Sequence, residues 1–155
     1  MAKVLEREKA LYDQDLLAWA ERQAALLRGG RIEALDTANL IEELEAMAAS
    51  RRRKLKRRLR VLLMHLLKWD FQLRRRSRSW ASTIAEQRAR IEDLLEESPS
   101  LRRELAATAR SAYPQALQRA AIETGLPCQS FPTDLPYGLD RIMGEDGGPD
   151  ELPTT

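Results

Sequence analysis

The stretch LKRRLRVLLMHLLKWDFQL, residues 55–73, decides the fold. Its apolar residues recur at alternating intervals of four and three positions, which is the near-heptad spacing of an α-helix packed lengthwise against other helices. The residues at these intervals are Leu55, Leu59, Leu62, Leu66, Trp69 and Leu73. The stretch therefore predicts a helix with one buried face.

The rest of the chain has the composition of a helical protein. Leu and Ala dominate the apolar residues and Arg and Glu are abundant, whereas β-branched and aromatic residues are scarce. A chain of 155 residues is long enough to bury a core without disulfides or a metal. The single cysteine, Cys128, excludes an intrachain disulfide and is typical of a reducing compartment. These features indicate an all-α protein.

Helix caps and apolar spacing predict four main helices arranged as a bundle. Asp13 is the expected cap of the first helix, which Gly29 and Gly30 end. The second helix is expected to begin after Asp36 and to continue through the quoted stretch. The buried stripes predicted on these two helices are Leu16, Leu17, Ala20, Ala24 and Leu27 on the first, and Leu40, Ile41, Leu44, Met47 and Ala48 on the second.

The second helix would be longer than a compact domain of this size. That mismatch predicts a kink or break near Ala49 and Ser50. The third helix is expected over residues 79–97, and the fourth over residues 99–124 with a bend at Pro114.

The segment that follows is rich in proline from Pro127 onwards, which predicts an extended strap across the bundle with one short helical turn near its end. We expect a single helical domain over residues 1–143 and a disordered tail over residues 144–155, because the tail lacks apolar residues to pack.

Charge is distributed unevenly along the chain, although the formal net charge is only +2. Residues 51–78 contain thirteen Lys or Arg and one Asp. Residues 1–50 contain six basic and ten acidic side chains, and residues 79–155 contain seven and thirteen. A basic middle lies between acidic flanks. No secretory signal and no apolar run of the roughly 20 residues that a membrane span needs is visible, so we expect a cytoplasmic protein without membrane contact.

The run RRRKLKRRLR, residues 51–60, is the first candidate site. On a helix it projects five cationic side chains away from the buried face: Arg53, Lys54, Lys56, Arg57 and Arg60. Such a surface would bind the phosphates of nucleic acids with a steep dependence on salt. The alternative is a solvated face paired with the chain's own acidic residues, and no helix-turn-helix or zinc spacing accompanies the run.

The second candidate is a metal-dependent enzyme site at His65. Asp15, Glu42 and Glu45 are the carboxylates that would complete it inside a bundle. The pattern is incomplete, since dicarboxylate metal bundles use Glu-x-x-His on two helices and this chain has one histidine. The alternative is a buried histidine that hydrogen-bonds a carboxylate or a carbonyl. Cys128 has no base or cation beside it in the sequence, and we expect it to be inert. No cofactor is expected.

Several segments in order resemble a known family. They are LYDQDLLAWAERQAALLRGG, LDTANLIEELEAM, LLMHLLKWDFQ, RSRSWASTIAEQRARIEDLLEESPSL, ETGLP and PYGLDRIM. Together they cover roughly residues 11–143 and are similar to the bacterial domain-of-unknown-function 29 family. The resemblance implies an all-α fold of bundle type and no established activity.

The sequence therefore favours a non-enzymatic interaction or regulatory module. Catalytic constellations are absent, and the apolar stripe of the second helix is longer than a small bundle needs, which predicts self-association as a homo-oligomer. Nucleic-acid binding through residues 51–60 is the first alternative, and a metal-dependent enzyme with its site at His65 is the second.

Overall fold

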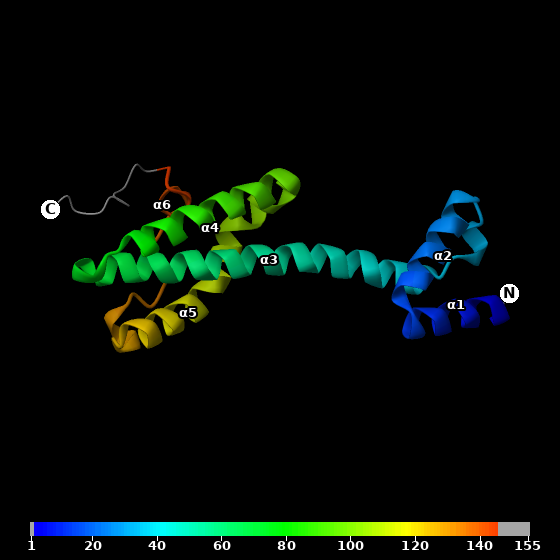
Figure 1. Ribbon diagram of the computed structural model, residues 1–155, viewed down its shortest axis with the longest axis horizontal. Coiled ribbons are helices and arrows are strands. Elements are labelled where there is room, and N and C mark those ends of the chain that lie inside the picture. The colour runs from blue at the N-terminus through cyan, green and yellow to red at the C-terminus, as the bar shows by residue number, and fades with distance from the viewer. Residues whose placement is uncertain (1, 146–155) are drawn as a thin grey trace. The chain divides into compact units, whose positions relative to one another are not determined.

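The computed structural model describes residues 2–145, and within them all regular structure is helical (Figure 1). The all-α prediction is confirmed. The number of main helices was predicted wrongly, because six α-helices and four short 3₁₀ helices are present in that range. No helix of the described residues is both long enough and apolar enough to cross a membrane. Of the tail predicted over residues 144–155, only the first two residues are described.

The chain divides into two compact units, one ending at Ser50 and the other beginning at Arg51. The first unit contains α1 (Ala2–Gln14), α2 (Leu16–Arg28), the 3₁₀ helix η1 (Ile32–Ala34) and the beginning of α3 (Thr37–Phe71). The second unit contains the rest of α3, η2 (Leu73–Arg75), α4 (Arg78–Glu97), η3 (Pro99–Glu104), α5 (Leu105–Thr124), η4 (Cys128–Ser130) and α6 (Leu139–Met143). The single domain predicted over residues 1–143 stays a prediction.

The cap predicted for the first helix was placed at the wrong aspartate. Asp15 leaves helical geometry, with φ −152° and ψ 90°, and its Oδ1 accepts a hydrogen bond from the Ala18 backbone N–H at 3.0 Å. Asp13 lies inside α1 instead. Asp15 therefore ends α1 and starts α2, which makes two helices from the one predicted. Gly30 adopts the expected left-handed conformation, with φ 69°, after α2 ends.

α1 and α2 form an antiparallel hairpin around Asp15. Glu8 on α1 accepts hydrogen bonds from the side chains of Arg22, at 3.2 Å, and Gln23, at 2.8 Å, both on α2. Tyr12, closer to the turn, packs edge-on against Trp19 with ring centroids 4.9 Å apart. Residues further before the turn thus meet residues further after it, as in a hairpin.

A polar network joins this hairpin to the start of α3. The buried carboxylate of Asp36 accepts hydrogen bonds from Trp19 Nε1 at 3.1 Å and from Asn39 Nδ2 at 2.7 Å. The Asp36 backbone N–H donates to Gln23 Oε1 at 2.8 Å, and Gln23 also bonds Glu8. The apolar core of this unit is small, and consists of Leu26, Ala34 and Leu35 with the half-buried Leu40. The predicted start of α3 after Asp36 is confirmed.

α3 is one uninterrupted helix, so the break predicted near Ala49 and Ser50 is wrong. That prediction assumed that the whole helix packs inside a single compact domain. The boundary between the two units falls instead after Ser50, within α3, and each unit uses only part of the helix.

The second unit is built around the later part of α3. α4 and α5 pack along it (Figure 1), and α5 presents small side chains that allow close approach. The buried residues contributed by α5 include Ala109, Ala112, Tyr113, Ala116 and Ala120. Leu55, Leu59, Leu62, Leu66 and Trp69 are fully buried, as predicted. Leu73 is exposed, because α3 ends at Phe71 and the chain turns into η2.

The predicted proline-rich strap is not confirmed. The segment after α5 holds the short helices η4 and α6, and two of its side chains, Phe131 and Ile142, belong to the buried core itself. Tyr113 on α5 fixes the segment by donating a hydrogen bond from its hydroxyl to the Pro132 carbonyl at 2.6 Å. These residues complete the core, whereas a strap would lie over a finished bundle.

Both buried stripes predicted in the first unit are wrong. All five predicted positions on α2 are exposed, and Trp19, Gln23 and Leu26 are buried in their place. On α3, Leu40 is half-buried and the other four predicted positions are exposed. The apolar side of each helix was identified correctly from the spacing, but in this unit the neighbouring helices pack against a different side.

Candidate functional site

Two surfaces emerge as candidates, a basic one on the second unit and an apolar one on the first. The basic run lies on the part of α3 that begins the second unit. Arg51 forms an ion pair with Glu97 at the end of α4. Arg52 binds Glu104 through two nitrogens, with Nε to Oε2 at 2.8 Å and Nη2 to Oε1 at 3.0 Å. Intramolecular pairing therefore neutralises the start of the run, as the alternative interpretation required.

The remaining cations of the run are in a different situation. Within residues 2–145, the side chains of Arg53, Lys54, Lys56 and Arg57 make no hydrogen bond or ion pair, and all but the half-buried Lys56 are exposed. Arg60 is half-buried and donates from Nη1 to Gln115 Oε1 at 3.0 Å.

Two acidic side chains, Glu43 on α3 and Glu92 on α4, form contacts with residues outside the run. Glu43 accepts a hydrogen bond from the Tyr12 hydroxyl at 2.7 Å, which raises the pKa of Tyr12 to about 12. Glu92 pairs with Arg102, which lies outside the run. A net positive surface therefore remains on α3.

A groove of about 440 Å³ lies between this part of α3 and the neighbouring η3 and α5. Its lining residues are Arg52, Arg53 and Lys56 from α3, Arg103 and Glu104 from η3, and Ala107, Thr108 and Ser111 from α5. The hydrogen bond from Arg52 lowers the pKa of Glu104, and the positive charges of Arg52 and Arg103 act in the same direction. The same hydrogen bond raises the pKa of Arg52, so that this pair stays ionised at neutral pH.

Sequence reasoning missed Arg103, Thr108 and Ser111 as members of this surface. They lie about 50 residues from the run in the chain, and only the register of α5 against α3 brings them to it. Arg103 was visible as a second basic residue after Pro99, but nothing in its spacing pointed to the run.

The structure does not show the four residues predicted to bind a metal in contact with one another. Asp15 serves as the cap of α2, and Glu42 and Glu45 are exposed on the first unit's part of α3, whereas His65 belongs to the second unit. Among residues 2–145 no three His, Cys, Asp or Glu side chains are grouped so that they could hold a metal ion. The metal hypothesis therefore has no preassembled ligand set in this range.

The side chain of His65 is half-buried and forms a hydrogen bond to the backbone of its own helix. Its Nδ1 lies 2.9 Å from the Val61 carbonyl one turn earlier, which requires the proton on Nδ1 and leaves Nε2 as the acceptor. Burial lowers the pKa of His65, so the ring is neutral at pH 7. One turn on, Lys68 pairs with Glu123 at 2.6 Å and lies 4.6 Å from the centre of the Trp80 ring. Cys128 is exposed at the start of η4.

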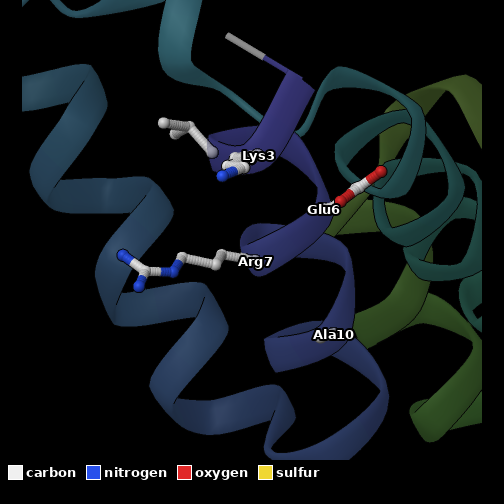
Figure 2. Close-up of a pocket in the computed structure, with 5 residues that line it drawn as sticks. Lys3, Glu6, Arg7 and Ala10 are labelled. Atoms are coloured by element: carbon white, nitrogen blue, oxygen red, sulfur yellow. The ribbon is translucent and has the colours of Figure 1, made fainter.

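A shallow hollow lies on the first unit, and its charged side chains do not point towards a common place. Its lining comes from α1 alone, and includes Lys3, Glu6, Arg7 and Ala10. Figure 2 shows Lys3 and Arg7 projecting from one side of the helix and Glu6 from the other. Because the charges point apart, this hollow holds no arrangement of groups aimed at a common ligand.

The second candidate surface is apolar. Among the described residues, thirteen large hydrophobic side chains are substantially exposed, and nine of them belong to the first unit. These nine are Val4, Leu5, Leu16, Leu17, Leu27, Ile32, Ile41, Leu44 and Met47. Scattered exposed apolar residues are normal in proteins, but the first unit holds more of them than the second, which makes its apolar side chains a candidate surface.

Comparison with known proteins identifies a family and nothing beyond it. The family model described as "Domain of unknown function DUF29" matches residues 11–146. No curated protein and no solved structure matches the chain. Since the match covers most of the sequence, the chain belongs to the DUF29 family.

Proposed function

We propose that this member of the DUF29 family is a non-enzymatic interaction module that associates with a second copy of itself through the apolar face of its first unit. The observation that carries the proposal is the contrast in exposure between the apolar stripes of α3 in the two units. Leu62, in the second unit's part of α3, is 0% exposed, whereas Leu44, in the first unit's part, is 60% exposed.

A second pair shows the same contrast. Ile41, in the first unit, is 52% exposed, and Leu59, in the second unit, is 0% exposed. The apolar stripe of α3 is therefore covered by neighbouring helices in the second unit, whereas in the first unit its apolar side chains are exposed in the part of the chain that the structure describes. Each Leu or Ile that a partner buries contributes roughly 1.5–3 kcal/mol, so a few such residues offset much of the cost of association.

The charges along α3 favour a second copy in the antiparallel direction. The helix is acidic over residues 42–45 and basic from Arg51 onwards. Two antiparallel copies would bring the acidic segment of each towards the basic segment of the other, whereas parallel copies would bring like charges together. A twofold interface of this kind is isologous, which is the commonest form of self-association.

The test is the molar mass in solution by light scattering and sedimentation. We expect a mass above the 17.7 kDa of one chain at micromolar concentration, and dissociation to the monomer for Leu44→Lys and Ile41→Lys. Ile122→Lys is the matched control, because Ile122 is 81% exposed on the second unit and lies outside the stripe. A wild-type monomer at 100 µM would overturn the proposal, and so would equal effects of all three substitutions.

A second candidate function, nucleic-acid binding through residues 51–60, is supported by Arg53, Lys54 and Arg57, which are exposed and form no ion pair with any residue in the range 2–145. If the run contacts phosphates, affinity for DNA or RNA should fall steeply as salt rises, with a log–log slope of several. Binding that does not depend on salt, or that persists when the free cations are changed to Glu, would contradict it.

A further inference from the structure

We infer that the groove between α3 and α5 is the phosphate-binding part of the basic surface, and that its occupant is the phosphodiester backbone of a nucleic-acid strand. The inference deepens the second candidate function and rests on it. It is narrower than that function, since it assigns the contact to a groove with two walls and includes a residue outside the basic run.

The first argument is the charge of the groove. Three cationic side chains in its lining, Arg53, Lys56 and Arg103, make no ion pair within residues 2–145. The one carboxylate present, that of Glu104, is already bound by Arg52 through two hydrogen bonds. An entering anion therefore meets three uncompensated positive charges, and the acidic group that would repel it is neutralised.

The second argument is the fixed spacing of the two walls. The core residues Leu55 and Leu59 of α3 and Leu105 and Ala109 of α5, which are close in the chain to the lining residues, belong to one buried cluster. Burial in one cluster holds the two helices together, so that the backbone positions from which the cations of the two walls extend are set before a ligand arrives. A surface of this kind binds with a smaller loss of backbone freedom than a flexible basic tail would.

The third argument is the presence of hydroxyl groups beside the cations. The Ser111 hydroxyl is exposed and makes no hydrogen bond to any residue that the structure describes, so it is free to donate to a phosphate oxygen. The Thr108 hydroxyl donates to the Glu104 carbonyl at 2.7 Å. Arginine, lysine and hydroxyl groups together are the usual protein donors to a nucleic-acid backbone.

The groove also predicts which cationic side chain of the run should contribute little to binding. Lys54 and Arg57 belong to the same run but do not line the groove. Lys54 points away from Lys56, towards the opposite side of α3, whereas Arg57 lies one turn from Arg53 and only about 40° around the helix from it. Lys54 supplies the same charge as the groove residues, and for this reason it is the matched control within one element.

The experiment is fluorescence anisotropy of a labelled 12-mer single-stranded DNA and the same RNA with the full chain, across a salt series. We expect Arg53→Glu, Lys56→Glu and Arg103→Glu each to weaken binding about tenfold or more, and Lys54→Glu to weaken it less than about threefold. Each groove substitution should also lower the log–log salt slope by about one, because one phosphate contact is lost.

Arg103→Glu is the decisive variant because Arg103 is not part of the run. Arg119→Glu, an exposed position on α5 outside the groove, makes the same change in net charge and should leave affinity nearly unchanged. Circular dichroism checks that each variant stays folded, and Arg103→Gln repeats the test without adding a negative charge.

The outcomes separate the two proposals. Equal weakening by all the run substitutions, with no effect of Arg103→Glu, would overturn the groove and leave nucleic-acid binding by the run intact. Absence of binding by the wild-type chain at low salt would overturn both. Binding of inorganic pyrophosphate, lost in Arg103→Glu, without any binding of the 12-mers would overturn the nucleic-acid occupant and identify a site for a small phosphorylated ligand.

Discussion

The two units of this chain are stabilised by different chemistry. The second unit buries a large cluster of Leu, Ile, Ala and aromatic side chains from α3, α4, α5 and the segment that follows. Among its described residues the first unit buries four apolar side chains, and a hydrogen-bonded network around Glu8, Gln23 and Asp36 takes the place of a larger core. A unit held by directional hydrogen bonds can leave its apolar side chains on the surface, where they are available to a partner.

The largest expected difference in stability is between two truncations on α3, one in each unit. Leu62→Ala removes a fully buried side chain and should lower the free energy of unfolding of the second unit by about 2–5 kcal/mol. Leu44→Ala, at an exposed position of α3 in the first unit, should change the stability of the monomer by less than about 0.5 kcal/mol. Denaturant unfolding followed by circular dichroism measures both.

The contrast between these variants is also a test of the proposed interface. Leu44→Ala should weaken self-association, and its effect should therefore grow with protein concentration. A loss of several kcal/mol for Leu44→Ala at concentrations where the chain is monomeric would show that this position is packed within one chain. The proposed difference in the packing of α3 between the two units would then be wrong.

The next effect concerns the polar network of the first unit. Asp36→Ala leaves the Trp19 indole and the Asn39 amide without their acceptor, and should lower the free energy of unfolding by about 1–3 kcal/mol. Asp36→Asn keeps one acceptor oxygen and should be milder. Hydrogen exchange of the Trp19 indole N–H, by NMR, reports on this unit directly, and an unchanged exchange rate in Asp36→Ala would show that the network is dispensable.

The sequence predicted burial most accurately where other helices cover the apolar face of α3. Spacing placed Leu55, Leu59, Leu62 and Leu66 correctly, because several helices cover that face. It failed at Leu44, since periodicity identifies the apolar side of a helix but not how far neighbouring helices extend along it. The cap was misplaced for a similar reason: Asp13 and Asp15 have equal intrinsic preference for the position, and only the hairpin contacts select Asp15.

The candidate site was predictable in part. Local composition identified the basic run, and its exposed members Arg53, Lys54 and Arg57 follow from helix geometry. The pairing of Arg52 with Glu104, and the approach of Arg103, depend on the register between helices about 50 residues apart. That register is set by the shapes of many core side chains together, which no short motif records.

A smaller effect should follow from removing one hydrogen bond in the second unit. Tyr113→Phe deletes the bond from its hydroxyl to the Pro132 carbonyl while the ring stays in the core, and should cost about 0.5–1.5 kcal/mol. Burial, and the negative charge of Asp134, raise the pKa of Tyr113 to about 12, so that the hydroxyl remains a donor at neutral pH. Thermal unfolding measures the change. A loss equal to that of Leu62→Ala would contradict the view that apolar packing dominates this unit.

The smallest effect is a pH dependence that belongs to the second unit alone. His65 is the chain's only histidine, and burial lowers its pKa from the ordinary value of 6.5. Between the lowered value and 6.5, the unfolded chain binds more protons than the folded chain, so the free energy of unfolding rises with pH. The contribution is complete above pH 6.5 and is lost progressively as the pH falls from 6.5 through the lowered pKa of the folded state.

The variant His65→Asn isolates this contribution, because the amide of Asn can still donate to the Val61 carbonyl but does not titrate. The difference in unfolding free energy between wild type and His65→Asn should be constant above about pH 7 and should fall as the solution becomes more acidic. NMR titration of the single imidazole gives the folded pKa directly. A value above 6.5 would reverse the expected slope, and would mean that the charge of Glu123 acts on the ring more strongly than its burial does.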